Sequence, residues 1–149
     1  MHFDGTFNVK ATKGRVFVLL MNPEELSKCM PDLQKIEVKS PDEYTAVIKA
    51  GVSFFYGNFD MHFNVVEKVP PTHTKIVAHG TGIKSTISLE TVIDLLDGPQ
   101  GETTIKWSAE AEISGILASV GQRLVAGQAE KIVEQLFDGL KEMLATPAP

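Results

Sequence analysis

Apolar and polar residues alternate at the start of the chain. Phe3, Phe7 and Val9 fall on one side of an extended backbone, and polar residues occupy the positions between them. A period of two residues is typical of a strand with one face in the core and the other in water. The pattern therefore predicts a half-buried strand over residues 2–10.

Two short helices are predicted next. Thr12 can cap a helical segment that carries apolar residues as far as Leu20. Asn22 begins a second segment, because it is a capping residue followed by proline in the first turn and by Glu25 at the third position. Pro31 ends this second segment, since proline cannot continue a helix.

The two-residue period returns after Pro31 and persists to residue 113. The intervening links are short and rich in Pro, Gly and Asp, which is the chemistry of tight turns. Short links join strands in antiparallel fashion. The predicted strands span residues 33–39, 44–50, 57–68, 72–81, 86–96 and 103–113.

The C-terminal part has a helical period. Apolar residues recur three or four positions apart from residue 116 to residue 144, which predicts one helix of about 43 Å with Ser114 as its N-cap. Gly121 then lies inside the helix at a cost of about 1 kcal/mol relative to alanine, which packing or ligand access would offset. Residues 146–149 are predicted to fray from a single domain that spans residues 1–145.

Small residues recur on the strand faces that the alternation places inside. They are Ala46, Ala50, Ala78, Gly80, Ala109 and Ala111. The helix opposite adds Ala118 and Gly121. Small side chains on both layers leave space that neither fills, so a cavity is expected. The alternative is that helix and sheet approach closely and leave no space.

A mostly apolar wall around this cavity suits an uncharged ligand. Trp107 adds an indole N–H that needs an acceptor if it is buried, either a ligand carbonyl or a backbone oxygen. The residues expected to contact the ligand are Phe54, Phe55, Phe59, Met61, Ala78, Gly80, Ile87, Leu89, Trp107, Ala109, Ala111, Leu117, Val120, Gly121 and Leu124.

Charge and composition exclude several other functions. The 149 residues carry a net charge of −5 and no Lys/Arg cluster, so nucleic acid is not an expected partner. Cys29 is the only cysteine, which leaves no intrachain disulfide and no Cys pair for a metal. All four histidines are predicted on outward faces or in turns. We expect no metal, no cofactor and no nucleophile–base pair.

The length of the apolar runs indicates where in the cell the protein is found. The apolar run over residues 16–21 is too short for a secretory signal or a membrane span, so a cytoplasmic protein is expected. The sequence leaves open two arrangements of Phe54, Phe55 and Tyr56. One is an exposed aromatic tip that contacts a membrane surface, and the other is a cluster within the sheet.

Several segments resemble the CoxG family of carbon monoxide dehydrogenase proteins, which belongs to the START-like (SRPBCC) superfamily. The order of one strand, two short helices, six strands and one long helix is that of the superfamily. Asp32 departs from the family, which usually has glycine there. The matching segments are Phe-Asp-Gly-Thr-Phe at 3–7, Asn-Pro-Glu-Glu-Leu at 22–26, Cys-Met-Pro at 29–31, Gly-Asn-Phe at 57–59, Trp-Ser-Ala-Glu-Ala-Glu at 107–112, Gly-Ile-Leu-Ala at 115–118 and Gly-Gln-Arg-Leu at 121–124.

The resemblance implies an α+β helix-grip fold, in which a curved seven-stranded antiparallel sheet wraps around a long C-terminal helix. It further implies an accessory protein that carries an isoprenoid quinone or similar lipid for a molybdenum hydroxylase of the carbon monoxide dehydrogenase type. Two alternatives remain. One is an assembly or adaptor protein for that enzyme, acting through its surface, and the other is a cyclase-like enzyme.

Overall fold

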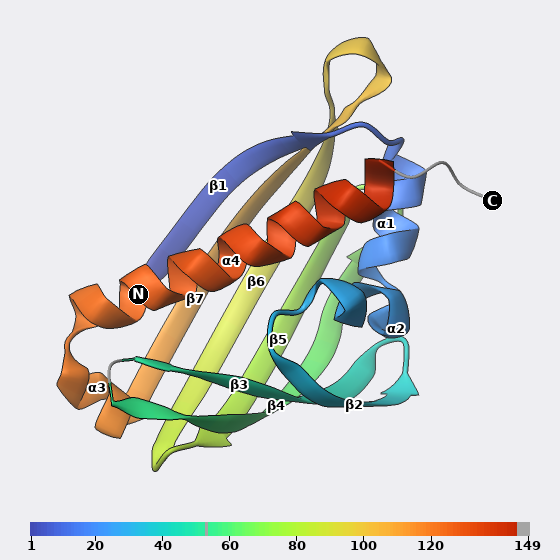
Figure 1. The fold of residues 1–149 in the computed structure, drawn as a ribbon. Helices are drawn as coiled ribbons and strands as arrows, with labels where there is room; N and C mark the ends of the chain where they lie inside the picture. Colours follow the sequence, from blue (N-terminus) through green and yellow to red (C-terminus); the bar gives the residue numbers. More distant parts are fainter. Residues whose placement is uncertain (53, 146–149) are drawn as a thin grey trace.

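A curved antiparallel sheet forms the body of the protein (Figure 1). The computed structural model describes residues 1–52 and 54–145, so the predicted fraying of 146–149 lies outside the described residues. The strand order is β1-β7-β6-β5-β4-β3-β2. The strands are β1 (His2–Val9), β2 (Leu33–Ser40), β3 (Glu43–Val52), β4 (Phe55–Val69), β5 (His73–Gly82), β6 (Ser85–Asp97) and β7 (Thr103–Gly115).

This sheet confirms the predicted fold class and meander. Observed strand ends differ from the predicted ones by at most two residues. Strands β2 to β6 each pair with the next strand along the chain, as their short links require. β1 instead pairs with β7, because the helices after β1 carry the chain to the opposite edge of the sheet.

The short helices follow the predicted caps. α1 spans Lys13–Leu20, and the Thr12 side chain accepts a hydrogen bond from the Arg15 backbone N–H at 3.3 Å. α2 spans Pro23–Leu26 and continues as a 3₁₀ turn over Ser27–Cys29. The Asn22 side chain caps α2 through the Glu25 N–H, also at 3.3 Å. Both caps satisfy N–H groups that the first helical turn leaves without a partner.

The prediction of one uninterrupted C-terminal helix was wrong. α3 spans Ile116–Val120 and α4 spans Gln122–Ala145, with Gly121 between them at φ 112° and ψ 137°. Only glycine adopts such a backbone without strain, so the chain turns at Gly121 instead of continuing the helix. Gly121 is therefore not inside a helix as predicted.

The predicted N-cap was also wrong. Gly115, at φ 90°, stands at the start of α3. A Cβ placed on Gly115 would lie 2.2 Å from the carbonyl oxygen of Lys84, so the close approach of the β5–β6 turn requires glycine. The Ser114 hydroxyl pairs with the Thr86 hydroxyl on the neighbouring strand instead.

α4 crosses the concave face of the sheet (Figure 1). Near its C-terminal end, Leu140 and Leu144 belong to a buried cluster with Val16 and Phe17 of α1. At the other end of the molecule, Leu117 of α3 belongs to a second cluster, which contains Phe59, Met61 and Ala78 of the sheet. The middle of α4 belongs to neither cluster. Of the helices in the described part of the chain, none has both the length and the hydropathy of a membrane span.

Candidate functional site

A cavity of about 400 Å³ lies between the sheet and the middle of α4. Six strands contribute to its wall, all except β2, and α4 covers it. The residues of α4 that are buried lie toward its two ends, with Val125 near the start and Leu140 and Leu144 near the C-terminal end, so the middle of the helix leaves space above the sheet. There Ala129 faces a part of the sheet that includes the small residues Ala109 and Ala111.

The structure places most of the predicted ligand contacts in this wall. Gly121 borders a second hollow, described below, that adjoins the cavity. The predicted residues that line the cavity itself are Phe59, Met61, Ala78, Ile87, Leu89, Trp107, Ala109, Ala111 and Leu117.

Two of the predicted contacts face solvent instead. Phe54 is 97% exposed at the tip of the β3–β4 hairpin, where the alternation of the strands no longer applies. Leu124 is 55% exposed, and its neighbour Val125 is buried in its place. The break at Gly121 changes the helical phase of α4 relative to α3, so a prediction that assumed one helix assigned Leu124 to the wrong face.

Three further predicted contacts lie near the cavity without lining it. Gly80 lies beneath Met61, because a Cβ on Gly80 would come within 2.1 Å of the Met61 sulfur. Phe55 packs against the cluster that contains Leu117. Val120 is only partly buried at the end of α3 and lines neither the cavity nor the second hollow.

The prediction missed several lining residues on β1 and α4. The period-two pattern of β1 and the helical period of α4 could have identified them, since both patterns mark the inner faces. The missed residues on these elements include Phe3, Phe7, Gln128, Ala129, Ile132, Val133, Leu136 and Phe137.

Few polar groups reach the cavity. The wall includes Tyr44, Thr91, Trp107 and Gln128, and no Asp, Glu, Lys, Arg or His among the described residues. Burial raises the pKa of Tyr44 to about 12, so this phenol stays neutral. The wall therefore suits an uncharged molecule with a small number of polar atoms.

Trp107 is the most distinctive of these polar groups. Its indole stacks edge-on against Phe137, with ring centroids 5.4 Å apart, and lies over Gly5 of β1. A Cβ on Gly5 would lie 3.0 Å from Nε1, so glycine makes room for the indole. None of the hydrogen bonds formed among the described residues uses the indole N–H, so the backbone oxygen, one of the two acceptors considered above, is not found.

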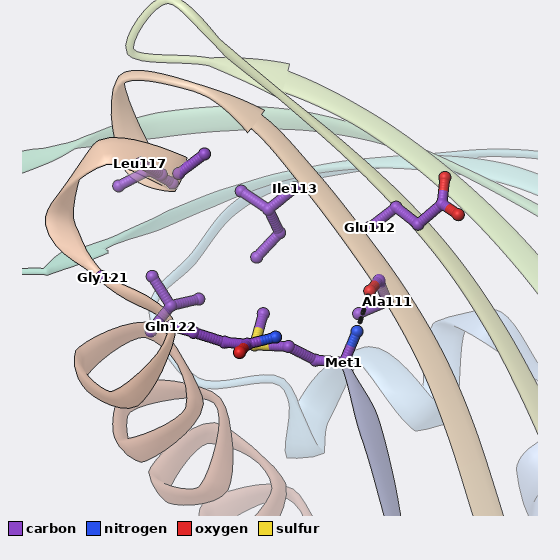
Figure 2. Close-up of a pocket in the computed structure, with 9 residues that line it drawn as sticks. Met1, Ala111, Glu112, Ile113, Leu117, Gly121 and Gln122 are labelled. Carbon is purple, nitrogen blue, oxygen red and sulfur yellow. Dashed lines mark hydrogen bonds between the residues drawn. The ribbon is translucent and has the colours of Figure 1, made fainter.

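A second hollow of about 370 Å³ adjoins the cavity (Figure 2). Met1, at the start of β1, and Gln122, at the start of α4, border this hollow. The two hollows share Met1, Ala111, Ile113, Leu117 and Val125. We call the second hollow the mouth of the cavity. It lies where Gly121 turns the chain between α3 and α4.

Other candidate chemistry lies outside the cavity. Cys29 is buried next to the Met143 sulfur, and desolvation raises the pKa of its thiol. His2, His62 and His79 are exposed. No group of three or more potential metal ligands occurs among residues 1–52 and 54–145. The cavity and its mouth are therefore the candidate functional site.

Residues 5–145 match the model of the CoxG family, which is described as a subunit of carbon monoxide dehydrogenase. The chain belongs to the CoxG family. No curated protein matches the chain. The match covers the sheet from residue 5 within β1 onward, both C-terminal helices and the residues around the mouth except Met1.

Solved structures similar to this CoxG-family protein confirm its START-like fold. A conserved protein from Geobacillus kaustophilus is 29% identical, with a TM-score of 0.90 over 97% of this chain and 95% of that chain. A START superfamily protein from Mycobacterium smegmatis is 10% identical, with a TM-score of 0.73 over 97% of each chain. A protein from Thermus thermophilus is 15% identical, with a TM-score of 0.70 over 97% of each chain.

Proposed function

We propose that this protein binds an isoprenoid quinone or similar apolar lipid in the cavity and carries it for a molybdenum hydroxylase of the carbon monoxide dehydrogenase type. The observation that carries the proposal is the apolar cavity of about 400 Å³ between the sheet and α4. This volume lies within the range of about 300–1,000 Å³ that is usual for small-molecule sites. Membership of the CoxG family supports the choice of partner enzyme.

The apolar wall of the cavity favours reversible binding of the ligand. Apolar contact contributes about 25 cal/mol for each Å² removed from water, and it needs no covalent or ionic partner. The mouth beside Gly121 offers a path along which a long isoprenoid chain can enter. Trp107, Thr91 and Gln128 supply the hydrogen-bonding groups for a ring that carries one or two carbonyl oxygens.

Trp107 also provides the test, because it is the only tryptophan and it lines the cavity. Quinones are electron acceptors that quench indole fluorescence at short range. Titration with a short-chain quinone should give saturable quenching for the natural sequence. Ala109→Phe places a ring in the cavity and should raise the Kd by about tenfold or more, since it removes ligand contact worth at least ~1.4 kcal/mol.

Val18→Phe is the matched control. Val18 is 68% exposed on α1, so the same kind of enlargement there should leave the Kd unchanged. Quenching that does not saturate, or an equal Kd for Ala109→Phe and the natural sequence, would contradict the proposal.

An adaptor role is the second candidate, and the family description as a subunit favours it. The same variant separates the two roles. Carriage requires the cavity, so Ala109→Phe should abolish quinone delivery to the enzyme. An adaptor that acts through its surface should support the enzyme equally well with Ala109→Phe.

A further inference from the structure

Tyr44 of β3 is a buried phenol without a hydrogen-bond partner. The residue is 3% exposed, and its ring stacks on Phe63 of the neighbouring strand with the ring centroids 4.9 Å apart. No hydrogen bond within residues 1–52 and 54–145 uses the Tyr44 hydroxyl. Buried phenols usually have such a partner. The protein therefore leaves one hydrogen-bonding group unused at this position.

The Tyr44 hydroxyl borders the cavity. Among the described residues that are not exposed, every side-chain nitrogen or oxygen that is closed off from water-sized space has a hydrogen-bond partner. Since the Tyr44 hydroxyl has none, it borders open space, and the open space that Tyr44 lines is the cavity. The same argument applies to the indole N–H of Trp107. A ligand in the cavity can therefore accept a hydrogen bond from each group.

Tyr44 and Trp107 approach the cavity from different sides (Figure 1). Tyr44 is in β3 and Trp107 is in β7, and the strand order places β4, β5 and β6 between them. Because the sheet bends around the cavity, the inner faces of β3 and β7 form opposite walls of one space. The two carbonyl oxygens of a para-quinone point in opposite directions from its ring. Donors on opposite walls match this arrangement.

Both groups present a hydrogen atom to the ligand. The indole N–H of Trp107 donates and cannot accept. Burial raises the pKa of Tyr44 to about 12, so the phenol keeps its proton. The other polar side chains of the wall, Thr91 and Gln128, lie on β6 and α4, and the described wall contains no carboxylate or imidazole. The ligand must therefore supply the acceptor at Tyr44 and at Trp107.

The number of hydrogen atoms at these contacts differs between a quinone and its quinol. A quinone oxygen carries no hydrogen, so the hydrogen of Tyr44 or Trp107 fills the single hydrogen bond between the protein and the ligand. A quinol oxygen carries its own hydrogen, which leaves two hydrogens for one hydrogen bond. The surplus hydrogen faces an apolar wall, and a buried donor without a partner is costly. The wall therefore favours the oxidised form.

We propose that the cavity binds the oxidised form of its quinone in preference to the quinol, with Tyr44 donating to one carbonyl oxygen and Trp107 to the other. The inference rests on the proposed function and adds to it the redox state of the ligand and the residues that select this state. A partner enzyme that adds two electrons and two protons converts the favoured form into the disfavoured one. The reduced product is then released more readily than the oxidised ligand.

Isothermal titration calorimetry with decylubiquinone and decylubiquinol tests the preference without relying on indole fluorescence. The two compounds have the same ring substituents and the same tail, and anaerobic conditions keep the quinol reduced. The natural sequence should bind decylubiquinone more tightly than decylubiquinol by about tenfold or more. Tyr44→Phe and Trp107→Phe each remove one donor. Each should raise the Kd of the quinone by about threefold to tenfold and the Kd of the quinol by less.

Tyr56→Phe is the matched control, because Tyr56 is 52% exposed and does not line the cavity. The same loss of a hydroxyl there should leave both Kd values unchanged. Urea denaturation of the ligand-free protein gives a second measurement. Since the Tyr44 hydroxyl has no partner in the protein, Tyr44→Phe should not lower the midpoint of unfolding. A lower midpoint would show that the hydroxyl has a structural role, and it would contradict the proposal.

The titrations separate this inference from the proposed function. Equal affinity for the quinone and the quinol overturns the inference and leaves the proposed function intact. Tighter binding of the quinol also overturns the inference, and so does a preference that both folded variants retain in full. A protein that binds neither compound refutes the proposed function and the inference together.

Discussion

The backbone N–H of Leu117 donates a 3.0 Å hydrogen bond to the Oγ of Ser85. Ser85 is the first residue of β6, and its own hydroxyl donates to the Ile83 carbonyl at 3.1 Å. The first turn of α3 is therefore capped by a residue from a different part of the chain. This contact connects the sheet to the helix that borders the mouth.

Replacing Ser85 with alanine should lower the free energy of unfolding by about 1–2 kcal/mol, because the buried Leu117 N–H loses its acceptor. Urea denaturation measures the change. Ser119→Ala is the control, since Ser119 is exposed on α3 and its replacement should alter stability by about 0.5 kcal/mol or less. Equal effects of the two substitutions would argue against capping by Ser85.

Two glycines near the start of α4 should respond in opposite directions to alanine. Gly121 has a φ of 112°, which a side chain opposes, so Gly121→Ala should destabilise the protein by about 1–3 kcal/mol. Gly127 lies inside α4 with open space around its Cα, so Gly127→Ala should stabilise it by about 0.5–1 kcal/mol. Thermal denaturation distinguishes the destabilising substitution from the stabilising one. Stabilisation by both substitutions would mean that α3 and α4 form one helix in solution.

Filling the cavity should affect stability and binding in opposite directions. Ala129→Leu places a larger apolar side chain against the cavity from α4. At about 0.8 kcal/mol for each buried methylene, it should stabilise the ligand-free protein by ~1–2 kcal/mol and weaken quinone binding. Ala126→Leu is the control, because Ala126 lies on α4 but does not line the cavity. Destabilisation by Ala129→Leu would indicate a filled interior.

His73 should make stability depend on pH. The Nε2 of His73 lies 2.8 Å from a carboxylate oxygen of Glu67, and its Nδ1 lies 2.7 Å from a carboxylate oxygen of Asp94. These two hydrogen bonds raise the pKa of His73 above its usual value near 6.5. Because the pKa is higher in the folded state, protonated His73 stabilises the fold. This stabilisation is complete below about pH 6.5 and is lost as the pH rises through the raised pKa.

The destabilisation caused by His73→Gln should therefore be larger near about pH 5.5 than near about pH 8.5. Urea denaturation at both pH values measures it. His2, between Asp4 and Glu110, has a pKa raised for the same reason, so His2→Gln should show the same sign. A loss of stability that is equal at both pH values would contradict this assignment.

The sequence predicted those features that depend on regular periodicity. Alternation placed Phe59, Met61 and Ala109 on the inner face of the sheet, where the structure has them. Periodicity could not locate the break at Gly121, because apolar residues continue at helical spacing on both sides of it. The wrong placement of Leu124 followed from the missed break, because the change in helical phase between α3 and α4 leaves no local signal in the composition.

The positions of Phe54 and Trp107 show a second limit of prediction from the sequence pattern. Phe54 lies at a hairpin tip, where alternation no longer indicates which side chain faces inward. The position of the Trp107 indole depends on Gly5 and Phe137, which are far from it in the chain. Contacts of this kind are set by the three-dimensional arrangement of the strands and α4, which a linear pattern does not encode.

An unfilled space beneath a helix that is held at both ends makes the empty protein sensitive to hydrostatic pressure. Unfolding eliminates the cavity of about 400 Å³, so hydrostatic pressure favours the unfolded chain through the reduction in volume. We expect an apolar ligand that fills this volume to reduce the effect of pressure, so that the protein unfolds at a higher pressure with the ligand than without it.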